Sequence, residues 1–290
     1  MRDGDEQMGY PLQSNRLYMM PTHFGPSPGL RQTKDGGRHI ADRPIKVTRY
    51  SVPFITHASQ LEALLPPGFS LSGDPVVTVD FGYQTDIPWL AGRGYNIVMV
   101  RFPVAFEGER DHVSGQFVSV LWENMADPII SGREQLGFSK IFADIAPPVE
   151  NEDDISAGAS WEGFEFLRFH YRNFKTLSPE EIQQMMMSTP LGDGLLHYKY
   201  IPATGEPWTD ADASYPTLTP FKTEEGIEMK IREVRVGEGK LEFNRPTWEQ
   251  MPTQNHIIDT FCDLEILEYL PSYVMKFEDN NDLRGQRRLR

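Results

Sequence analysis

The sequence predicts a mostly β fold of the α+β type, in which curved antiparallel sheets close into a barrel-like cavity and the few helices are short. One observation is that 24 glycines and 23 prolines divide the 290 residues into short segments. The other is that these segments are rich in β-branched and aromatic residues, which favour strands. Short strands joined by tight turns are typical of sheets that curve around an enclosed space.

Three regions are expected along the chain. Residues 1–42 are polar and rich in turn formers, which predicts an N-terminal extension that is either disordered or wrapped around the body. Residues 43–278 contain the predicted strands and helices. Residues 279–290 are a polar tail whose basic end, Arg284–Arg290 (RGQRRLR), is expected to fray.

In the first half of the main region, Ser59 and Glu62 stand at capping-box spacing before LEALL and predict a short helix at about 59–65. Apolar runs bounded by glycine and aspartate predict three strands, VVTVDFG (76–82), YNIVMVRFPVAF (95–106) and GQFVSVLW (115–122). A short helical segment follows at about 126–136.

In the second half, ASWEGFEFLRFHY (159–171) predicts one strand. A helix start is predicted where Ser178 can cap, Pro179 takes the first helical position and Glu181 closes a capping box. Strand-like segments follow at LLHYKYI, IEMKIREVRV and KLEF, and a turn at GEG is expected to join the last two. The strands then continue through CDLEILEYL to YVMKF.

The charge of the chain argues against two classes of partner. A net charge of −14 and a pI near 5.0 are opposite in sign to what a nucleic-acid binder or a protein bound to an anionic membrane normally shows. The single cysteine, Cys262, cannot form an intramolecular disulfide, and the sequence shows neither a signal-peptide core nor a membrane-spanning apolar stretch. We therefore expect a cytoplasmic protein.

Sequence motifs for cofactors and metals are missing. Neither GxGxxG nor GxxxxGK[ST] occurs after a strand, so no nucleotide cofactor is expected. The seven histidines show no HExxH spacing, no CxxC occurs, and no metal is expected, although a site assembled from distant residues stays open. A GxSxG nucleophile elbow is also absent. His170 and His197 stand in aromatic strand segments, and we interpret them as structural.

A lone lysine, Lys140, stands in an otherwise apolar run within SGREQLGFSKIFADI (131–145). Most lysines in such runs lay their stems on apolar surface and keep the ammonium in water. The functional alternative is a Schiff-base lysine, whose amine must be partly neutral near neutral pH. Burial among apolar side chains favours the neutral form, and Phe138, Ile141 and Phe142 could supply such surroundings.

The segment GREQLGFSK resembles the signature of the acetoacetate decarboxylase family, in which a Gly-Arg-Glu turn precedes an aromatic-Pro-Lys segment with a Schiff-base lysine. The resemblance extends over roughly residues 43–278, through LEALLPPGF, YNIVMVRFPVAF, FVSVLWENMADPIISGRE, EVRVGEGKLEF and HIIDTFCDLEILEY. It implies a small-molecule keto acid or dicarbonyl substrate, an imine at Lys140 and a homo-oligomer.

The chain departs from the family pattern around this lysine and near its start. Ile141 stands where the decarboxylases have a second lysine, so one cation that would favour the neutral amine is missing and desolvation must act alone. Ser139 replaces the usual proline. For the family's N-terminal arginine, gapless matching gives Val47, with Arg43 and Arg49 nearby.

The carboxylates of the family are retained only in part. Ile97 stands where the family has a strand glutamate, whereas Asp80 matches a second family acid on an earlier strand. Strand interiors rarely keep an unpaired aspartate. Asp80 is therefore expected either to pair with a cation such as Lys140 or Arg133, or to have a raised pKa and act as the catalytic acid.

The remaining candidates surround the lysine in sequence or by resemblance. Arg133 and Glu134 are interpreted as anchors of the turn that carries Lys140, with a role near the substrate kept open. Tyr95 starts the strand that contains Ile97. The residues expected to contact the substrate are Tyr95, Ile97, Arg133, Glu134, Phe138 and Ile141.

Three functions follow from these residues. The first is a Schiff-base lyase that decarboxylates a β-keto acid or acts on a related 1,3-dicarbonyl through a Lys140 iminium. The second is a Schiff-base aldolase, dehydratase or cyclase that acts on a larger keto substrate without loss of carbon dioxide. The third is a non-catalytic barrel that binds an apolar carbonyl compound.

Overall fold

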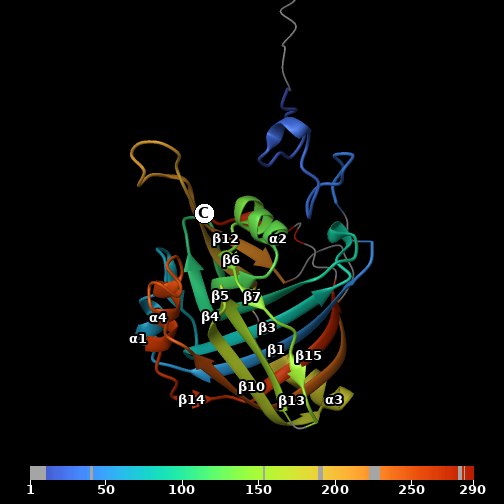
Figure 1. Cartoon of the computed structure of the whole chain (residues 1–290), viewed down its shortest axis with the longest axis vertical. Helices are drawn as coiled ribbons and strands as arrows, with labels where there is room; N and C mark the ends of the chain where they lie inside the picture. The colour runs from blue at the N-terminus through green and yellow to red at the C-terminus, as the bar shows by residue number, and fades with distance from the viewer. Residues whose placement is uncertain are drawn as a thin grey trace, which may run out of the picture.

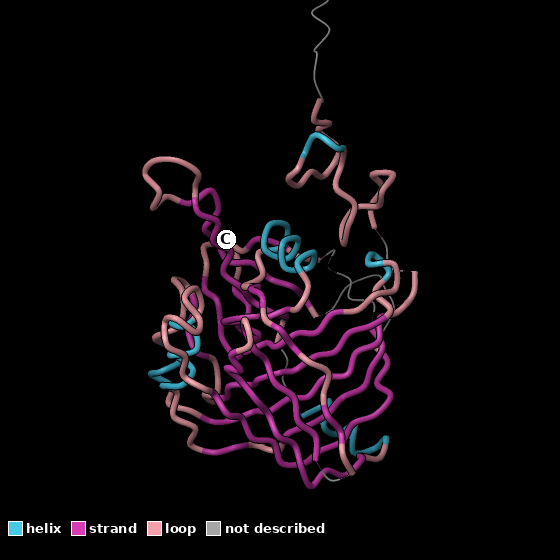
Figure 2. Tube along the Cα trace, viewed as in Figure 1, coloured by secondary structure: helices cyan, strands magenta, loops and turns pink. Residues whose placement is uncertain are grey.

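The computed structural model describes residues 11–39, 42–152, 154–188, 192–221, 229–279, 283 and 285–290, and in this part the chain forms one large curved sheet with short helices at its margins (Figures 1 and 2). The strands are β1 (Ile45–Ile55), β2 (Phe69–Leu71), β3 (Val76–Thr85), β4 (Tyr95–Glu107), β5 (His112–Glu123), β6 (Lys140–Phe142), β7 (Asp144–Ile145), β8 (Val149–Glu150), β9 (Asp154–Trp161), β10 (Phe164–Thr176), β11 (Gly194–Pro202), β12 (Ala211–Pro220), β13 (Lys230–Phe243), β14 (Glu268–Tyr269), β15 (Ser272–Asp279) and β16 (Arg287–Arg288). The helices are η1 (Thr22–Phe24), α1 (Ala58–Glu62), η2 (Pro88–Leu90), α2 (Ala126–Ser131), η3 (Gly132–Leu136), α3 (Pro179–Ser188) and α4 (Asn255–Asp263).

The order of the strands shows that the sheet is open. It runs β16-β12-β11-β5-β4-β3-β1-β15-β13-β10-β9-β7, with β2, β6, β8 and β14 added beside β4, β5, β9 and β1. Most neighbours are antiparallel, but β5 runs parallel to both β6 and β11. The prediction of a mostly β fold with few, short helices is confirmed. The prediction of barrel closure is wrong, because the end strands β16 and β7 have only 2 residues each and do not pair with each other in the described part of the chain.

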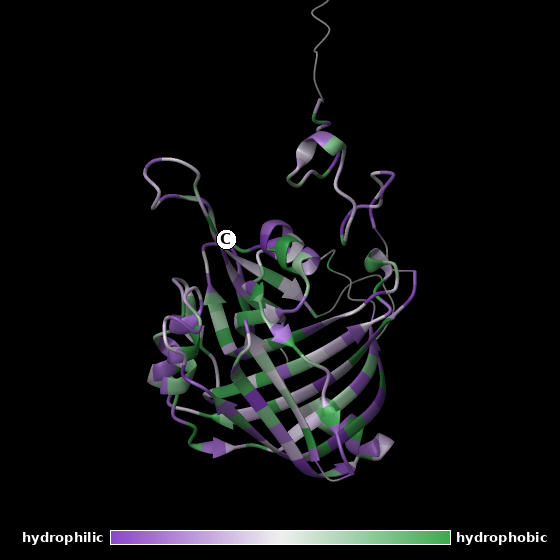
Figure 3. Cartoon of the chain, in the orientation of Figure 1, coloured by the Kyte–Doolittle hydropathy of each residue, from purple (hydrophilic) through white to green (hydrophobic). Residues whose placement is uncertain are grey.

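Successive side chains of a strand point to opposite faces of the sheet. Along several strands hydrophilic and hydrophobic residues alternate, coloured purple and green in Figure 3. On β3, Val79 and Phe81 belong to the larger apolar core, which α4 covers through Ile258 and Phe261. The other face, called the Lys140 face below, carries a second apolar cluster. Its buried members are Ile45, Val47, Ile87, Tyr95, Ile97, Met99, Val118, Leu121, Val234, Met275 and Phe277.

Two strand predictions need correction. The segment 159–171 is not one strand but the hairpin β9–β10, because Glu162 and Gly163 both take positive φ, 46° and 85°, as a two-residue hairpin turn requires. Conversely, the GEG segment is not a turn, and β13 runs straight through it. A Cβ at Gly237 would lie 2.5 Å from the Arg172 carbonyl oxygen, so this glycine permits close approach between strands.

The C-terminal third also differs from the prediction. HIIDTFCD forms most of α4, whose buried Ile258 and Phe261 stand at helical spacing. The segment CDLEILEYL, predicted as strand, therefore begins in a helix and contains only the short strand β14. The described end of the expected frayed tail is ordered, because β16 pairs with β12 and Leu289 is buried. Arg284 lies outside the described residues.

The helix start predicted at Ser178 is confirmed. The Glu181 backbone N–H donates to the Ser178 hydroxyl at 3.2 Å, and the Ser178 N–H donates to the Glu181 carboxylate at 2.8 Å. These reciprocal hydrogen bonds form the capping box that begins α3. In the described part of the chain, no helix combines the length and the hydrophobicity needed to span a membrane.

The N-terminal segment is described from residue 11 and lies at one end of the sheet (blue in Figure 1). Gln135 of η3 donates a hydrogen bond to the Met19 sulfur at 2.7 Å, which ties this segment to the body.

Candidate active site

The backbone around Lys140 places its side chain on the buried face of the sheet. Gly137, with a φ of +84°, ends η3, and β6 then pairs in parallel with β5 so that Lys140 lies beside Leu121. A Cβ at Gly132 would lie only 2.5 Å from Cδ and 2.8 Å from Nζ of Lys140. Glycine at position 132 therefore makes room for the lysine side chain, and Arg133 fixes the strand by donating to the Lys140 carbonyl at 2.8 Å.

The Lys140 ammonium is buried and has a partner. Its Nζ lies 2.8 Å from Oε1 of Glu123, and it donates to the Pro128 carbonyl at 3.1 Å. The same nitrogen lies 5.1 Å from the ring centroid of Phe138 and 5.9 Å from that of Tyr95. An apolar run with one buried lysine thus surrounds an ion pair rather than a solvated side chain.

Glu123, the last residue of β5, is a candidate functional residue that was not predicted from the sequence. Its side chain is 1% exposed, and its Oε2 has no hydrogen-bond partner among the described residues. Burial raises the pKa of Glu123, and the opposing attraction of Lys140 does not cancel this effect. A carboxyl group of this kind can accept a proton from the neighbouring ammonium.

Strand register relates Glu123 to the position where the family resemblance implies a lost carboxylate. Ile97 on β4 is the direct cross-strand partner of Glu123 on β5. Side chains at directly opposite positions of an antiparallel pair have Cβ atoms about 4.5–5.5 Å apart. A carboxylate at position 123 therefore lies in nearly the same region of the Lys140 face as one at position 97 would.

Tyr95 also lies on this face and is buried. Burial, together with the nearby Glu123 carboxylate, raises the pKa of Tyr95 well above its usual range, although a hydrogen bond with Gln84 acts in the opposite direction. The phenol is therefore a neutral hydrogen-bonding group beside the lysine.

Asp80 lies on the same face but belongs to a different cluster. The register runs from Asp80 through Met99 and Leu121 to Lys140, so their backbones are three strand spacings, or about 14 Å, apart along the sheet. Asp80 accepts hydrogen bonds from Ser51 and, at 2.6 Å, from Nε of Arg101.

These contacts decide between the two alternatives for Asp80. Burial alone would raise the pKa of Asp80, but Arg101 and Arg49 outweigh it and hold the pKa below its usual value. The aspartate pairs with a cation, as one alternative expected, but that cation is neither Lys140 nor Arg133. A carboxyl group whose pKa is lowered is a poor proton donor near neutral pH, which argues against the acid role.

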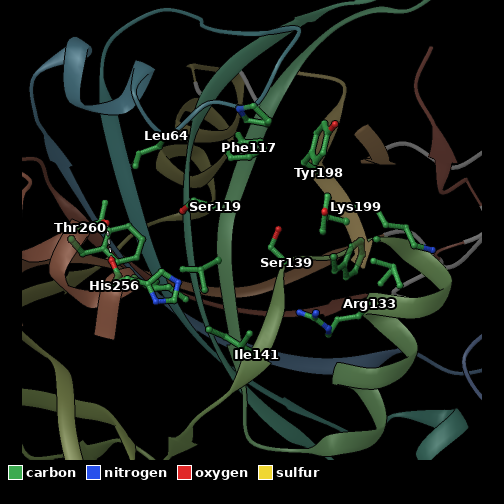
Figure 4. Close-up of a pocket in the computed structure, with 18 residues that line it drawn as sticks. Leu64, Phe117, Ser119, Arg133, Ser139, Ile141, Tyr198, Lys199, His256 and Thr260 are labelled. Carbon is green, nitrogen blue, oxygen red and sulfur yellow. Dashed lines mark hydrogen bonds between the residues drawn. The ribbon is translucent and has the colours of Figure 1, made fainter. Parts of the chain in front are cut away.

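The other residues predicted to contact the substrate do not all lie on the Lys140 face. Phe138 contacts the ammonium, whereas Arg133 and Ile141 line a cavity of about 470 Å³ that Lys140 does not line (Figure 4). Phe138 and Ser139 line this cavity as well. The Glu134 side chain is exposed, and its carbonyl accepts a hydrogen bond from Lys199 at 2.6 Å.

No group of three or more histidine, cysteine, aspartate or glutamate side chains among the described residues is arranged to hold a metal ion. The arrangement on the Lys140 face is instead that of an amine, a carboxyl group with a raised pKa and a phenol within an apolar surrounding, which suits covalent chemistry on a carbonyl compound.

Comparison with known proteins identifies the family of the chain. The family model described as acetoacetate decarboxylase matches residues 19–283, and the chain belongs to that family. The match begins within the segment assigned above to the N-terminal extension. No curated protein matches the sequence.

Several solved structures share the fold. The enduracididine biosynthesis enzyme MppR complexed with pyruvate has 17% sequence identity and a TM-score of 0.63, with coverage of 92% of this chain and 98% of that chain. The acetoacetate decarboxylase from Legionella pneumophila has 18% identity and a TM-score of 0.62, with coverage of 85% and 87%. An acetoacetate decarboxylase-like enzyme from Sphingomonas wittichii RW1 has 17% identity and a TM-score of 0.58, with coverage of 86% and 93%.

Proposed function

We propose that this chain is a Schiff-base lyase that decarboxylates a β-keto acid or a related 1,3-dicarbonyl compound at Lys140. The observation that carries the proposal is the buried pair of Lys140 and Glu123, 2.8 Å apart on an apolar face. Membership of the acetoacetate decarboxylase family supports the same reaction class.

Imine formation uses Glu123 to carry one proton. The ammonium of Lys140 gives a proton to the Glu123 carboxylate, and the free amine attacks the ketone carbon to form a carbinolamine. Glu123 returns the proton to the hydroxyl group, which leaves as water, and the product is a protonated iminium. The regenerated carboxylate then stands beside the new cation, as it stood beside the ammonium.

Decarboxylation follows from the electron demand of the iminium. The bond between the α-carbon and the carboxylate breaks, its electron pair moves toward the iminium nitrogen, and carbon dioxide leaves a neutral enamine. The α-carbon takes a proton that comes ultimately from water, and hydrolysis releases the ketone and the lysine. The apolar surroundings favour this step because it removes buried charge.

Arg49 is the residue to which we assign the substrate carboxylate. The register on the Lys140 face runs from Arg49 through Gly82 and Ile97 to Glu123. Gly82 has no side chain, and the Ile97 side chain packs over it, so that a Cβ at Gly82 would lie 2.8 Å from Cγ1 of Ile97. The guanidinium lies 5.0 Å above the Phe277 ring, and its Nε has no hydrogen-bond partner among the described residues. Asp80 would keep Arg101 and Arg49 in place as a fixed counter-ion.

The test is reductive trapping followed by peptide mapping. Incubation with β-keto acids and borohydride should add the reduced substrate to the peptide that contains Lys140, with release of carbon dioxide in the absence of reductant. Lys140→Ala should abolish both signals. Lys199→Ala removes a lysine whose ammonium is bound elsewhere and should leave them unchanged. Trapping at Lys199, or full turnover by Lys140→Ala, would contradict the proposal.

A second reaction, aldol condensation or dehydration without loss of carbon dioxide, is supported by one comparison. MppR has also been solved with the condensation product of pyruvate and imidazole 4-carboxaldehyde, at 17% identity to this chain. If Lys140 is trapped by keto acids while no carbon dioxide appears, this second reaction is the correct one.

A further inference from the structure

His197 is a buried histidine close to the proposed reaction centre that the mechanism above does not use. It lies on β11 and is 1% exposed, and its ring stacks on Phe138 with the centroids 4.3 Å apart. Phe138 in turn lies 5.1 Å from the Lys140 nitrogen. The imidazole therefore lies one aromatic ring away from the reactive amine.

The hydrogen-bonding capacity of this histidine is unused within the described part of the chain. Neither ring nitrogen has a partner among the described residues, and the same is true of the hydroxyl of Thr217. Thr217 on β12 is the direct cross-strand partner of His197 and is 3% exposed. An unpaired buried polar group is unfavourable because it has lost its hydrogen bonds to water, and native proteins seldom keep several together unless another molecule pairs with them.

The imidazole at this position is neutral. Burial, together with the nearby Lys140 ammonium, lowers the pKa of His197 to about 3. A neutral imidazole has one donor and one acceptor nitrogen, and a threonine hydroxyl can act as either. This pair is suited to an uncharged polar group and offers no charge to a carboxylate.

The two sides of the Lys140 face thus differ in chemistry. Strands β6 and β11 both pair with β5 on the side away from β4, so His197 and Arg49 lie on opposite sides of Glu123. A substrate joined to Lys140 through its ketone would extend its carboxylate toward Arg49, and its other arm would pass the Phe138 ring to reach His197.

We propose that His197 and Thr217 form a subsite that hydrogen-bonds a hydroxyl or amide group on the arm of the keto substrate remote from its carboxylate. The inference rests on the proposed function, because it takes the ketone to be held at Lys140. It narrows the substrate class from simple aliphatic keto acids to those with a second, uncharged polar group.

The first experiment compares two β-keto acids of equal chain length, one ending in a methyl group and one in a hydroxymethyl group. Reductive trapping at Lys140 should be about tenfold more efficient with the hydroxylated probe, the effect of roughly one hydrogen bond to a buried partner. Thr217→Val and His197→Phe should each reduce that preference, while trapping of the methyl probe changes less. Equal trapping of the two probes by the unmodified protein overturns the proposal and leaves the Schiff-base mechanism standing.

The second experiment does not depend on imine formation. With ¹⁵N-labelled histidine, the hydroxylated probe should shift the His197 ring signals, assigned by their loss in His197→Gln, more than the methyl probe does. If no probe is trapped but these signals still shift selectively, the subsite stands and the Schiff-base function is wrong. Ring signals that respond equally to both probes, as expected if the two side chains share only an internal water, contradict the subsite.

Discussion

Replacing Glu123 with glutamine keeps the shape of the side chain but leaves the Lys140 ammonium buried without its counter-ion. Opposite charges 2.8 Å apart attract each other by about 6 kcal/mol at an effective dielectric constant of about 20. Desolvation of both groups offsets part of this attraction, and removing one partner of a buried pair typically costs about 3–5 kcal/mol. We expect Glu123→Gln to lower the free energy of unfolding by about that amount at neutral pH.

The assay is urea unfolding of a double-mutant cycle with Lys140→Met. The variant that carries both changes has no buried charge at this place, so it should be more stable than the sum of the two single losses implies. We expect the difference, the coupling free energy, to be at least about 2 kcal/mol, within the usual range of about 0.5–3 kcal/mol for contacting residues. Glu134→Gln is the matched control, because Glu134 is exposed and its removal should change stability by no more than about 0.5 kcal/mol.

Additivity of the two single losses to within about 0.5 kcal/mol would refute this reasoning. Lys140 and Glu123 would then not interact as buried charges, and Glu123 could not be the group that takes the proton from the amine.

Three further outcomes are expected. Gly132→Ala places a methyl group within 2.8 Å of the Lys140 side chain and should reduce trapping at Lys140 about 100-fold, whereas Gly29→Ala, which meets no atom within 4 Å, should have no effect. Arg101 and Arg49 lower the pKa of Asp80 despite its burial, so the stabilising contribution of Asp80 is present above about pH 4 and is lost as the pH falls through the lowered pKa. Asp80→Asn should therefore destabilise the protein at neutral pH and reduce the further loss of stability on acidification. Urea unfolding at neutral pH and at acidic pH measures both effects. Burial lowers the pKa of His197 to about 3, so the histidine of the unfolded chain binds a proton first as the pH falls from about 6.5. The free energy of unfolding should then decline by about 1.4 kcal/mol per pH unit until the lower pKa is reached. His197→Gln should remove this slope, and an unchanged slope would contradict a neutral buried imidazole.

The sequence predicts some local features of this fold, and others only the structure reveals. The capping box at Ser178 depends on residues three positions apart, and the predicted hydrogen bonds are present. Two glycine-containing segments were interpreted the wrong way round, since Glu162-Gly163 is a turn and Gly237-Glu238-Gly239 is extended. At Gly237 the cause is the neighbouring strand, which passes close to this glycine and cannot be read from the local sequence.

The candidate site was likewise predictable from the sequence only in part. The apolar residues beside Lys140 made its burial one of two alternatives, but its partner Glu123 lies on another strand, 17 positions earlier in the sequence. A signal was present, because Glu123 ends the apolar run FVSVLW and alternation places it on the same face as Leu121. To connect Glu123 with Lys140, one must also know that β5 pairs with β6, and the sequence of each strand taken alone does not show this.

The cross-strand pairing of Glu123 with Ile97 suggests that this face of the sheet requires a carboxylate but tolerates it on either strand. We expect Glu123→Leu to abolish trapping at Lys140, and the addition of Ile97→Glu to restore it to within about tenfold, because a glutamate side chain can span the roughly 5 Å between opposite Cβ atoms. Adding Ile97→Gln instead controls for shape, and it should restore nothing because an amide cannot take the proton. If Ile97→Glu also restores nothing while the variant remains folded, the position of the carboxylate at the end of β5 is essential. Glu123 would then act first by holding the β6 lysine in place, and proton transfer would have to be assigned to another group on the Lys140 face.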